Sequence, residues 1–342
     1  MRTSVDTRLV FLAENLTQAW NLNLQDDPNV EVLRGSLPAK LMRLLNLIGK
    51  REVELVNLAG WGHPLLFAAM LVAAIYRIPI TIESDTQFEP TKSAWRRAIK
   101  RLIFPTLFRI PRLFLPAGTR QKNYFMRYGV DQRQIRVAQM SVDVCSIMAQ
   151  VDMYRAKSTH DLSKKQFVVF LYVGRLELYK GIHDLLKAFV DLNRDGDSAR
   201  LIIVGDGSLR EFVQSSASTN SNITYLGRLS GEELFNVYSQ ANVFVLPSRV
   251  EPWGLVINEA MAASLPVIAT DRVGCIEDLL RQGENGYVVP SSNPNSLAEA
   301  MRNFIRRPDL AETMGQKSRQ LIADWTIEDE AKIMLAAWSE VT

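Results

Sequence analysis

Short runs of apolar and β-branched residues alternate along the chain with longer segments in which apolar residues recur at helical spacing. This alternation is typical of parallel sheets whose connecting helices cover both faces. Six candidate strands lie in the first half of the chain, at residues 8–13, 30–33, 53–58, 79–83, 112–115 and 135–139. Six more lie in the second half, at residues 167–173, 200–204, 223–226, 243–246, 266–269 and 287–289. We therefore expect an α/β protein with two parallel sheets.

A polar stretch without clear period, residues 145–165, separates the two sets of strands. We place the domain boundary within it. The predicted domains are an N-terminal one over residues 1–157 and a C-terminal one over residues 158–322, followed by a last helix within residues 323–342. Ligands of open α/β sheets bind at the carboxyl ends of the strands, so we expect a site where two such sheets face a cleft.

Composition and charge narrow the class of protein. With 342 residues, of which 47% are hydrophobic, the chain can bury the cores of two domains. Its formal net charge of +3 is close to balance and gives no reason to expect a nucleic-acid partner. Cys145 and Cys275 are the only cysteines, too few for a disulfide framework and without the spacing of a zinc site. Such cysteine usage fits a reducing compartment.

The sequence predicts neither export nor a membrane span. Its first residues lack the apolar core and the cleavage site of a secretion signal. The longest apolar run, residues 64–76, is shorter than the roughly 20 residues that a helix needs to cross a bilayer. We interpret this run as a buried helix and expect a cytoplasmic protein.

Two cations mark the loop after the first strand of the second half. This loop begins at Gly174 and carries Arg175 and Lys180 at the entrance to a predicted helix. Cations at a helix N-terminus oppose the helix dipole, so an anion such as a diphosphate is expected to compensate them. The alternative is that both side chains are solvated or paired with Glu177 and Asp184.

Two carboxylates frame a second loop of the same half, which follows the strand at residues 243–246. Glu251 lies just before a predicted helix, and the amides of residues 254–256 are placed to meet a phosphate. Glu259 shares a helix face with that turn and could accept hydrogen bonds from ribose hydroxyls. The alternative is that Glu251 only balances the helix dipole and that Glu259 is exposed or paired.

A third loop is Gly205-Asp206-Gly207-Ser208. By itself it is weak evidence for a binding site, because Gly-Asp-Gly also occurs in ordinary turns. A dinucleotide-binding site for hydride transfer typically has the motif G-x-G-x-x-G, and Arg210 occupies the position of its last glycine. The oxidoreductase interpretation is therefore disfavoured.

Taken in order, these loops resemble a known family. The motifs that carry the resemblance are G-R-L-x-x-x-K-G, G-D-G, Y-L-G-R-L at 225–229, E-P-W-G-L-V-I-N-E-A from 251, P-V-I-A-T from 266 and G-E-N-G-Y from 283. Together they make residues 167–305 similar to the nucleotide-sugar-binding half of the retaining glycosyltransferases of family 4. Those enzymes have the GT-B fold, in which two Rossmann-like domains with parallel sheets face each other across a cleft.

The resemblance implies a role for each candidate residue of the second half. Arg175 and Lys180 would neutralise the donor diphosphate, and Glu251 would meet the sugar hydroxyls. Main-chain groups near Arg228 and Leu229 would hold the base, the backbone of Trp253, Gly254, Leu255 and Val256 would meet the β-phosphate, and Glu259 would meet the ribose. Gly174, which begins the loop of Arg175, is a further donor-binding candidate. Fixed cations and a helix N-terminus stabilise the charge that builds on a departing diphosphate, so we expect no metal.

Metal-dependent glycosyltransferases commonly carry an Asp-x-Asp motif, which Asp195-Gly196-Asp197 matches. This tripeptide falls between a predicted helix end and a strand start, so we interpret it as a turn.

The first half departs from the family pattern. Family members commonly carry a glycine-rich loop after the first strand, and residues 14–20 contain no glycine. They also commonly show a histidine after the fourth strand, where this chain has Asp85 as the positional equivalent. We therefore name Asp85 as a catalytic candidate whose equivalence to that histidine is open. His63 follows a different strand and is expected at a helix entrance or in an acceptor loop.

A basic amphipathic helix is predicted within residues 91–116, where seven Lys or Arg residues occur and no Asp or Glu. Trp95, Ile99, Leu102 and Ile103 recur on one side of this helix, and basic residues occupy the other. Such a helix can lie on an anionic lipid surface. The alternative is an ordinary domain helix with a solvated basic face.

From these observations we expect a metal-independent, retaining hexosyltransferase that is cytoplasmic or peripheral at the inner face of the cell membrane. Its donor is a nucleotide-diphosphate sugar, with UDP-glucose favoured over GDP-mannose. Its acceptor is a saccharide or a lipid-linked acceptor in polysaccharide, lipopolysaccharide or glycolipid assembly. Two alternatives remain, a donor-binding but catalytically idle subunit of a polysaccharide-assembly complex and a GT-B nucleotide-sugar hydrolase or epimerase.

Overall fold

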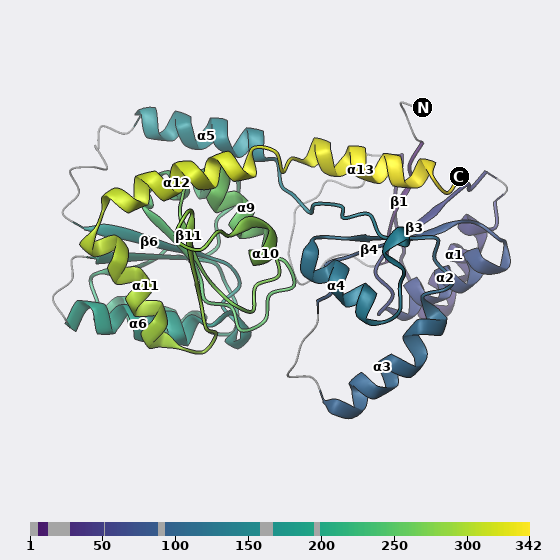
Figure 1. The fold of residues 1–342 in the computed structure, drawn as a ribbon, viewed down its shortest axis with the longest axis horizontal. Helices are drawn as coiled ribbons and strands as arrows, with labels where there is room; N and C mark the ends of the chain where they lie inside the picture. Colours follow the sequence, from purple (N-terminus) through teal and green to yellow (C-terminus); the bar gives the residue numbers. More distant parts are fainter. Residues whose placement is uncertain (1–5, 13–27, 51, 88–92, 158–166, 195–198) are drawn as a thin grey trace. The chain divides into compact units, whose positions relative to one another are not determined.

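The computed structural model describes residues 6–12, 28–50, 52–87, 93–157, 167–194 and 199–342 (Figure 1). Contacts between Cα atoms divide the chain into two compact units. The first unit contains Met1–Ala117, Gln121–Ala138 and Ala331–Thr342, and the second contains Gly118–Arg120 and Gln139–Glu330. The chain therefore passes between the units four times.

The first unit is built on short parallel strands. β1 (Leu9–Phe11) pairs with β2 (Val30–Val32), and β3 (Val56–Ala59), β4 (Ile80–Ser84) and β5 (Leu113–Pro116) form a sheet in the order β3-β4-β5. The helices between these strands are α1 (Leu37–Ile48), α2 (Pro64–Ile75) and α3 (Ala94–Leu107), and α4 (Thr119–Arg127) follows β5. A single 3-10 turn, Gln132–Gln134, follows α4. The strand predicted at residues 135–139 is reduced to one parallel bridge between Ile135 and Phe114.

Alternation along β5 divides the core of the first unit between the two faces of its sheet. Phe114 points into a cluster of buried side chains from α1, α2, α4 and β4. Its neighbours Leu113 and Leu115 point to the other face, where Ala337 of α13 (Ile327–Ser339) covers them. Successive residues of a strand face opposite sides, so a strand of apolar residues can serve both cores.

The apolar run at residues 64–76 forms α2, so the predicted helix is confirmed, but only one side of it is buried: four of its residues are buried, and Phe67, Leu71 and Ile75 are exposed. Its N-terminus is capped by His63, whose Nδ1 accepts a hydrogen bond from the Leu65 amide at 3.2 Å. A cap satisfies one of the amides that a helix start leaves without an intrahelical partner. His63 is thus a helix-entrance residue, which is one of the two roles expected for it.

The second unit contains a six-stranded parallel sheet in the order β11-β10-β9-β6-β7-β8. Its strands are β6 (Val168–Val173), β7 (Ala199–Val204), β8 (Ile223–Tyr225), β9 (Val243–Leu246), β10 (Val267–Thr270) and β11 (Gly286–Val289). All six agree with the predicted strands to within about two residues at each end. β6 and β9 are neighbours although they are far apart in sequence, so the loops at their carboxyl ends meet.

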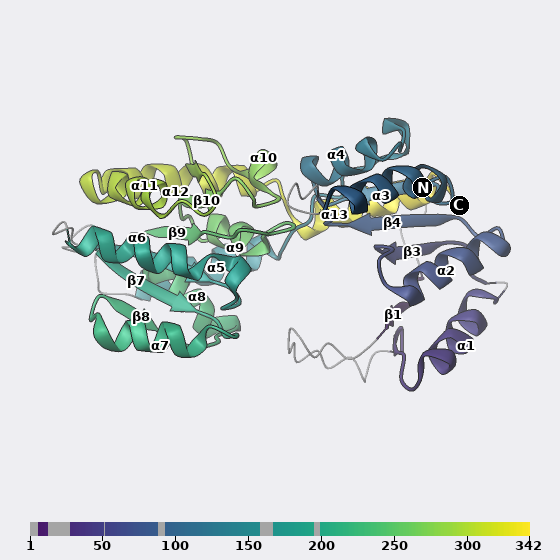
Figure 2. The same ribbon diagram turned by 90° about the horizontal axis from the view of Figure 1, so that it is seen from below.

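Helices cover both faces of this sheet (Figures 1 and 2). α6 (Ile182–Arg194) packs against α11 (Pro294–Arg306) on one face. On the other face α5 (Val144–Lys157) packs against α8 (Gly231–Gln240) and α9 (Leu255–Ala262), and α12 (Asp309–Ile322) packs against α9. The shorter helices α7 (Arg210–Thr219) and α10 (Ile276–Leu279) complete the unit. This is the parallel α/β layering that the alternation of patterns predicts.

The division into units differs from the predicted boundary at residue 157. α5 ends at Lys157, and its packing on α8 and α9 makes it part of the second unit, which begins again at Gln139. At the other end of the unit, residues up to Glu330 belong to it, eight more than predicted. The polar stretch that suggested the boundary contains most of α5, whose buried face the sequence pattern did not show.

No helix in the described part of the chain is long and apolar enough to cross a membrane.

Phe125 of α4 offers a test of the core of the first unit. Its side chain is fully buried, and its ring centroid lies 4.8 Å from Phe114 and 5.4 Å from Trp61. We expect Phe125→Ala to lower the free energy of unfolding by about 3–5 kcal/mol through the cavity it leaves. Ile75→Ala, at a side chain that is 77% exposed, should change it by less than about 0.5 kcal/mol. Urea unfolding followed by circular dichroism measures both, and similar losses for the two variants would contradict this core.

Candidate functional site

The loops after β6 and β9 are joined through their main chains. The carbonyl of Tyr179 accepts hydrogen bonds from the amides of Arg249 at 2.8 Å and Val250 at 3.2 Å. Both loops lie at carboxyl ends of adjacent parallel strands, where open α/β sheets bind ligands. The sheet order therefore brings together two segments that are about 70 residues apart.

An ion pair links the side chains of these two loops. Lys180 Nζ contacts Glu251 Oε2, and the two side chains are only 12% and 10% exposed. The hydroxyl of Ser248, a fully buried residue, donates to the same carboxylate oxygen at 3.1 Å. A carboxylate in such a position needs both partners, because burying an uncompensated charge is strongly unfavourable.

The alternative partners considered for the two cations are engaged elsewhere. Glu177 accepts hydrogen bonds from the amide and hydroxyl of Ser208, at 3.1 and 2.7 Å, and these bonds lower the pKa of its carboxyl. Asp184 binds the guanidinium of Arg249 through two hydrogen bonds of 2.9 Å. The interpretation in which Glu177 and Asp184 neutralise Arg175 and Lys180 is therefore wrong for Lys180.

Arg175 lies on the exposed side of the same loop. Its guanidinium carbon is 5.6 Å from the centroid of the Tyr179 ring, and Lys180 Nζ is 5.7 Å from the same centroid. The two cations thus flank one aromatic ring, and burial raises the pKa of its hydroxyl. Gly174, which begins the loop, donates its amide to the carbonyl of Val204 at 3.0 Å. In the described part of the chain Arg175 has no ion-pair partner.

Helix α9 starts later than its sequence suggests, and this leaves its first amides open. Gly254 is the N-cap residue, with φ of 103°, a left-handed conformation that favours glycine. Pro252 suits a first helical position but lies before the helix, which begins at Leu255. The amides of Leu255 and Val256 donate to no acceptor among the described residues. They are free to bind an anion, and the helix dipole favours one there.

Trp253 contributes its main chain and not its side chain to this surface. The side chain is 2% exposed, its Nε1 donates to Asn258 Oδ1 at 3.2 Å, and its ring stacks on Trp325 at 6.0 Å between centroids. The donor-binding role expected of Trp253 can therefore involve only its backbone.

Glu259 lies one turn inside α9 and is partly buried. Its Oε2 accepts a hydrogen bond of 2.8 Å from the hydroxyl of Tyr238, a fully buried residue of α8. Burial raises the pKa of the Glu259 carboxyl, and the Tyr238 hydrogen bond opposes that effect. One carboxylate oxygen remains available for a ligand hydroxyl.

Arg228 and Leu229 follow β8, next to the Gly-Asp-Gly turn. The carbonyl of Gly227 accepts the Gly205 amide at 2.7 Å, and the Tyr225 hydroxyl donates to the Gly205 carbonyl at 3.0 Å. Arg228 is exposed and Leu229 is partly exposed. The structure therefore ties their segment to the Gly-Asp-Gly turn, and that turn is joined to the loop of Arg175 through hydrogen bonds of Leu176.

Asp85 belongs to the first unit, just after β4. Its charge raises the pKa of the neighbouring Glu83, on which burial acts more strongly in the same direction. Two carboxylates thus lie at the carboxyl end of this strand, and the sequence analysis singled out only the second of them. Residues 14–20 and Asp195-Gly196-Asp197 lie outside the described residues.

Three residues of the site were missed by the sequence analysis. Ser248 supports Glu251, the Tyr179 ring lies between the two cations, and Tyr238 holds Glu259. Only Tyr179 carried a signal, because it immediately precedes Lys180 in the recognised motif.

The arrangement of the second unit suits a pyrophosphate. Lys180 and Arg175 supply positive charge, and the open amides of Leu255 and Val256 follow directly after Glu251. Such fixed donors and cations bind phosphate groups and stabilise charge that develops on them. Among the described residues, no group of three or more His, Cys, Asp or Glu side chains is placed to hold a metal ion.

Residues 154–321 match the family described as "Glycosyl transferases group 1". This segment of the chain is a group 1 glycosyl transferase domain. Over 158 residues it is 32% identical to an alpha-D-kanosaminyltransferase of Streptomyces kanamyceticus, a match that covers 45% of this chain and 41% of that protein. It is also 32% identical over 167 residues to the capsular polysaccharide biosynthesis glycosyltransferase CapM of Staphylococcus aureus, covering 48% and 43%. The chain thus aligns with less than half the length of these glycosyltransferases.

A solved structure extends the similarity in fold to most of the chain. The HepE protein of Anabaena in complex with UDP-glucose aligns with a TM-score of 0.72 at 17% identity, covering 91% of this chain and 86% of that one. Together with two parallel α/β units, this likeness confirms the expected GT-B fold. The matched residues lie within the second unit, which carries the ion pair and the open helix N-terminus.

The raised pKa of Glu259 predicts a pH-dependent effect on stability. A folded-state pKa above the unfolded value contributes stability that is present below the unfolded pKa and lost as pH rises through the folded pKa. Glu259→Gln keeps an acceptor for Tyr238 and removes the charge, so its melting temperature relative to wild type should rise between about pH 4 and about pH 7. Glu233→Gln, at an exposed residue of α8, should show no such trend. Thermal unfolding across pH measures both, and a constant difference for Glu259→Gln would refute the assignment.

Proposed function

We propose that this chain is a retaining hexosyltransferase that uses a nucleotide-diphosphate sugar. The observation that carries the proposal is the Lys180–Glu251 ion pair beside the open amides of Leu255 and Val256. Membership of the group 1 glycosyl transferases supports the reaction class. UDP-glucose is the favoured donor, and the HepE complex with that molecule in a similar fold supports this choice.

Each part of the site has a role in this reaction. The bond between the anomeric carbon and the β-phosphate oxygen breaks, and the acceptor oxygen forms its bond on the same face of the sugar. The acceptor proton passes to the leaving phosphate oxygen, so the products are the glycosylated acceptor and UDP. Arg175, Lys180 and the α9 N-terminus stabilise the charge that builds on the phosphate, and the reaction then needs no metal. Glu251 orients the sugar through its hydroxyls.

Glu259 and the segment of Arg228 and Leu229 hold the nucleoside in this proposal. The free oxygen of Glu259 accepts from the ribose, and main-chain groups near Leu229 bind the base. Asp85, in the first unit, acts on the acceptor side of the sugar in place of the family histidine. The acceptor in this proposal is a saccharide or a lipid-linked acceptor in polysaccharide, lipopolysaccharide or glycolipid assembly, and the name of the CapM relative supports the first of these.

A second candidate is a donor-binding subunit that does not transfer the sugar, or one that hydrolyses or epimerises it. It is favoured by the sequence at Asp85, where the family commonly has histidine, and by the lack of glycine at residues 14–20. Binding of UDP-glucose without transfer or hydrolysis by the intact protein would select the idle subunit.

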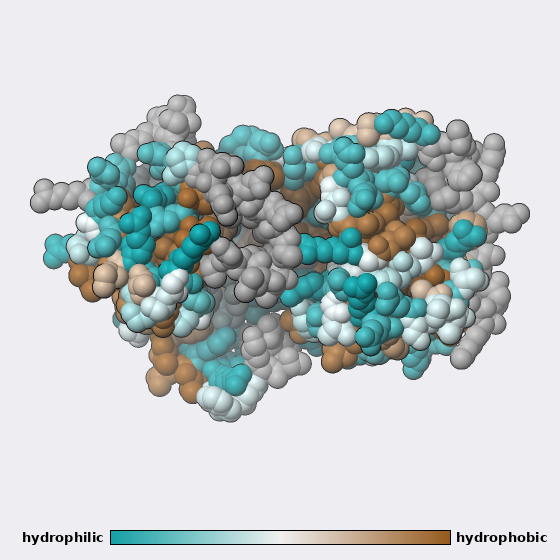
Figure 3. Space-filling model, turned by 180° about the vertical axis from the view of Figure 1, so that it is seen from behind, coloured by the Kyte–Doolittle hydropathy of each residue, from teal (hydrophilic) through white to brown (hydrophobic). Residues whose placement is uncertain are grey.

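We also propose that α3 docks on an anionic membrane surface, at the inner face of the cell membrane. Its apolar side chains point away from the protein core: Trp95 is 61% exposed, Ile99 45%, Leu102 81% and Ile103 51%. Figure 3 shows hydrophobic side chains gathered along α3, at the lower left of the view. An ordinary domain helix packs its apolar side chains against the core, as α3 does with Phe104 and Leu107, but the exposure of its other apolar side chains supports docking.

The basic residues of α3 are divided between its flanks and its inner side. Arg96 and Arg101 are exposed beside the apolar strip, and the Arg96 guanidinium lies 5.4 Å from the Trp95 ring centroid. Lys100 is turned toward the core, where it donates to the Tyr124 hydroxyl at 3.3 Å. An exposed apolar strip flanked by arginines matches the interface of a bilayer that contains anionic lipids.

The donor site is tested by replacing its two cations. We expect Arg175→Ala and Lys180→Met each to weaken UDP-glucose binding roughly tenfold or more, since each removes a charged phosphate contact. Lys187→Met, at an exposed lysine on α6 of the same unit, is the matched control and should leave affinity within about twofold. Isothermal titration calorimetry measures all four proteins. Unchanged affinity in both cation variants would overturn the donor assignment.

The membrane surface is tested by co-sedimentation with phosphatidylcholine vesicles that contain or lack phosphatidylglycerol. We expect binding only with the anionic lipid, and its loss on Leu102→Glu, because a carboxylate then enters the apolar strip. Ile75→Glu, on the equally exposed end of α2, should still bind. Binding should also weaken with salt, because exposed arginines are screened. No sedimentation at low salt, or self-association abolished by Leu102→Glu without lipid, would contradict the proposal.

A further inference from the structure

The start of α4 belongs to the second unit although both of its flanks along the chain belong to the first. Residues Gly118–Arg120 form their contacts with α10 and with the loop before it. Gly118 lies so close to the Trp253 ring and to Asp278 that a side chain there would collide with both. This close approach explains why glycine precedes the helix.

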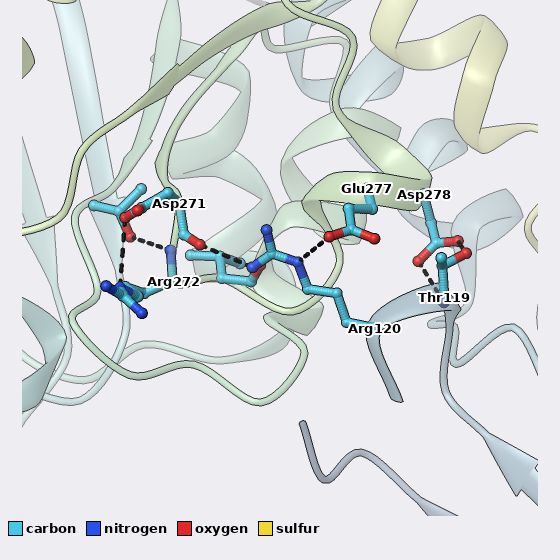
Figure 4. Close-up of polar contacts among 8 residues, drawn as sticks. Thr119, Arg120, Asp271, Arg272, Glu277 and Asp278 are labelled. Atoms are coloured by element: carbon cyan, nitrogen blue, oxygen red, sulfur yellow. Dashed lines mark hydrogen bonds and ion pairs between the residues drawn. The ribbon is translucent and has the colours of Figure 1, made fainter. Parts of the chain in front are cut away.

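Asp278 and Glu277 of α10 receive this segment. The Asp278 carboxylate accepts the Thr119 amide at 2.9 Å and its hydroxyl at 2.5 Å, and so caps α4 from another helix. A carboxylate at a helix N-terminus is favoured by the helix dipole and satisfies an open amide. Arg120 Nε donates to Glu277 Oε1 at 2.8 Å (Figure 4).

Arg120 also reaches past Glu277 to the main chain of the loop after β10. Its Nη1 donates to the carbonyl of Asp271 at 2.8 Å and to that of Val273 at 3.1 Å. Figure 4 shows the guanidinium between the Asp271 main chain and the Glu277 carboxylate. The planar guanidinium can hold several acceptors in one fixed geometry, which a lysine cannot reproduce.

The loop that Arg120 holds is itself in contact with the donor-site segment. Val273 forms a parallel bridge with Glu251, whose carbonyl accepts the Gly274 amide at 2.9 Å. The next amide, of Cys275, donates to the carbonyl of Trp253 at 3.1 Å. The Val273 side chain lies against Gly254, 3.2 Å from where a Cβ of that residue would stand. The loop therefore contacts three of the four residues from Glu251 to Gly254.

We propose that Arg120 is a positioning residue for the donor site. Arg120 fixes the carbonyls of Asp271 and Val273 and so holds the loop at residues 271–275. This loop in turn fixes the positions of Glu251 and of Gly254, the N-cap residue of α9. Arg120 does not touch the donor, and it acts through the main chain of residues 273–275. The inference rests on the proposed function, since the site it positions is the donor site.

UDP affinity of full-length variants tests this inference. We expect Arg120→Ala to weaken UDP binding roughly tenfold, since the loss of two charge-assisted hydrogen bonds displaces the loop. Arg120→Lys, which can reach one carbonyl, should recover part of the loss. Glu277→Gln keeps both carbonyl bonds, and Arg281→Ala removes an exposed arginine of the same unit, so each should stay within about twofold of wild type. Wild-type affinity in Arg120→Ala, or an equal loss in Glu277→Gln, overturns the inference.

Hydrogen exchange without ligand gives a second, independent measurement. We expect Arg120→Ala to speed exchange of the Gly274 and Cys275 amides and to leave β6 amides unchanged, because the effect is local. A uniform increase over the second unit would mean general destabilisation and would overturn the proposed positioning. If wild-type protein fails to bind UDP or UDP-glucose, the proposed function is wrong, and the exchange measurement still decides whether Arg120 holds the loop.

Discussion

The ion pair between Lys180 and Glu251 depends on one topological fact, the adjacency of β6 and β9 in the second sheet. Parallel strands that are distant in sequence deliver their following loops to the same edge of the sheet. The pair is largely buried, so each charge needs the other. The Ser248 hydroxyl donates a further hydrogen bond to the Glu251 carboxylate. Near this pair, the open amides at the N-terminus of α9 and the exposed guanidinium of Arg175 can bind an anion.

The second unit was largely predictable from the sequence because three of its strands, β6, β9 and β10, are fully buried and are formed by mainly apolar runs. Each predicted strand there exists, and three of the recognised motifs fall at the carboxyl ends of β6, β7 and β9. Periodicity could not show the start of α9, because the left-handed Gly254 delays the helix past Pro252. It also could not show partners such as Tyr238, since tertiary contacts between helices leave no local signature.

For the first unit, the sequence pattern predicted fewer features of the structure correctly. The helix at residues 94–107 was recognised as amphipathic, but which side it buries is a tertiary property, and the structure turns its apolar side outward. The domain boundary was missed for a related reason: the sequence of α5 shows no clear apolar face, and its packing on α8 and α9 decides its unit. The four crossings of the chain between units are defined by contacts and not by linker composition.

The capping of α4 by Asp278 has a consequence for dissecting this molecule. A fragment that starts at residue 139 would keep the whole matched family segment and lose Thr119 and Arg120, so that Glu277 and Asp278 would face water. Exchanging whole C-terminal halves between relatives would break the same contacts unless the tripeptide at 118–120 travelled with them. Among relatives, the residues at these three positions should therefore co-vary with those of α10, as expected for surfaces in contact.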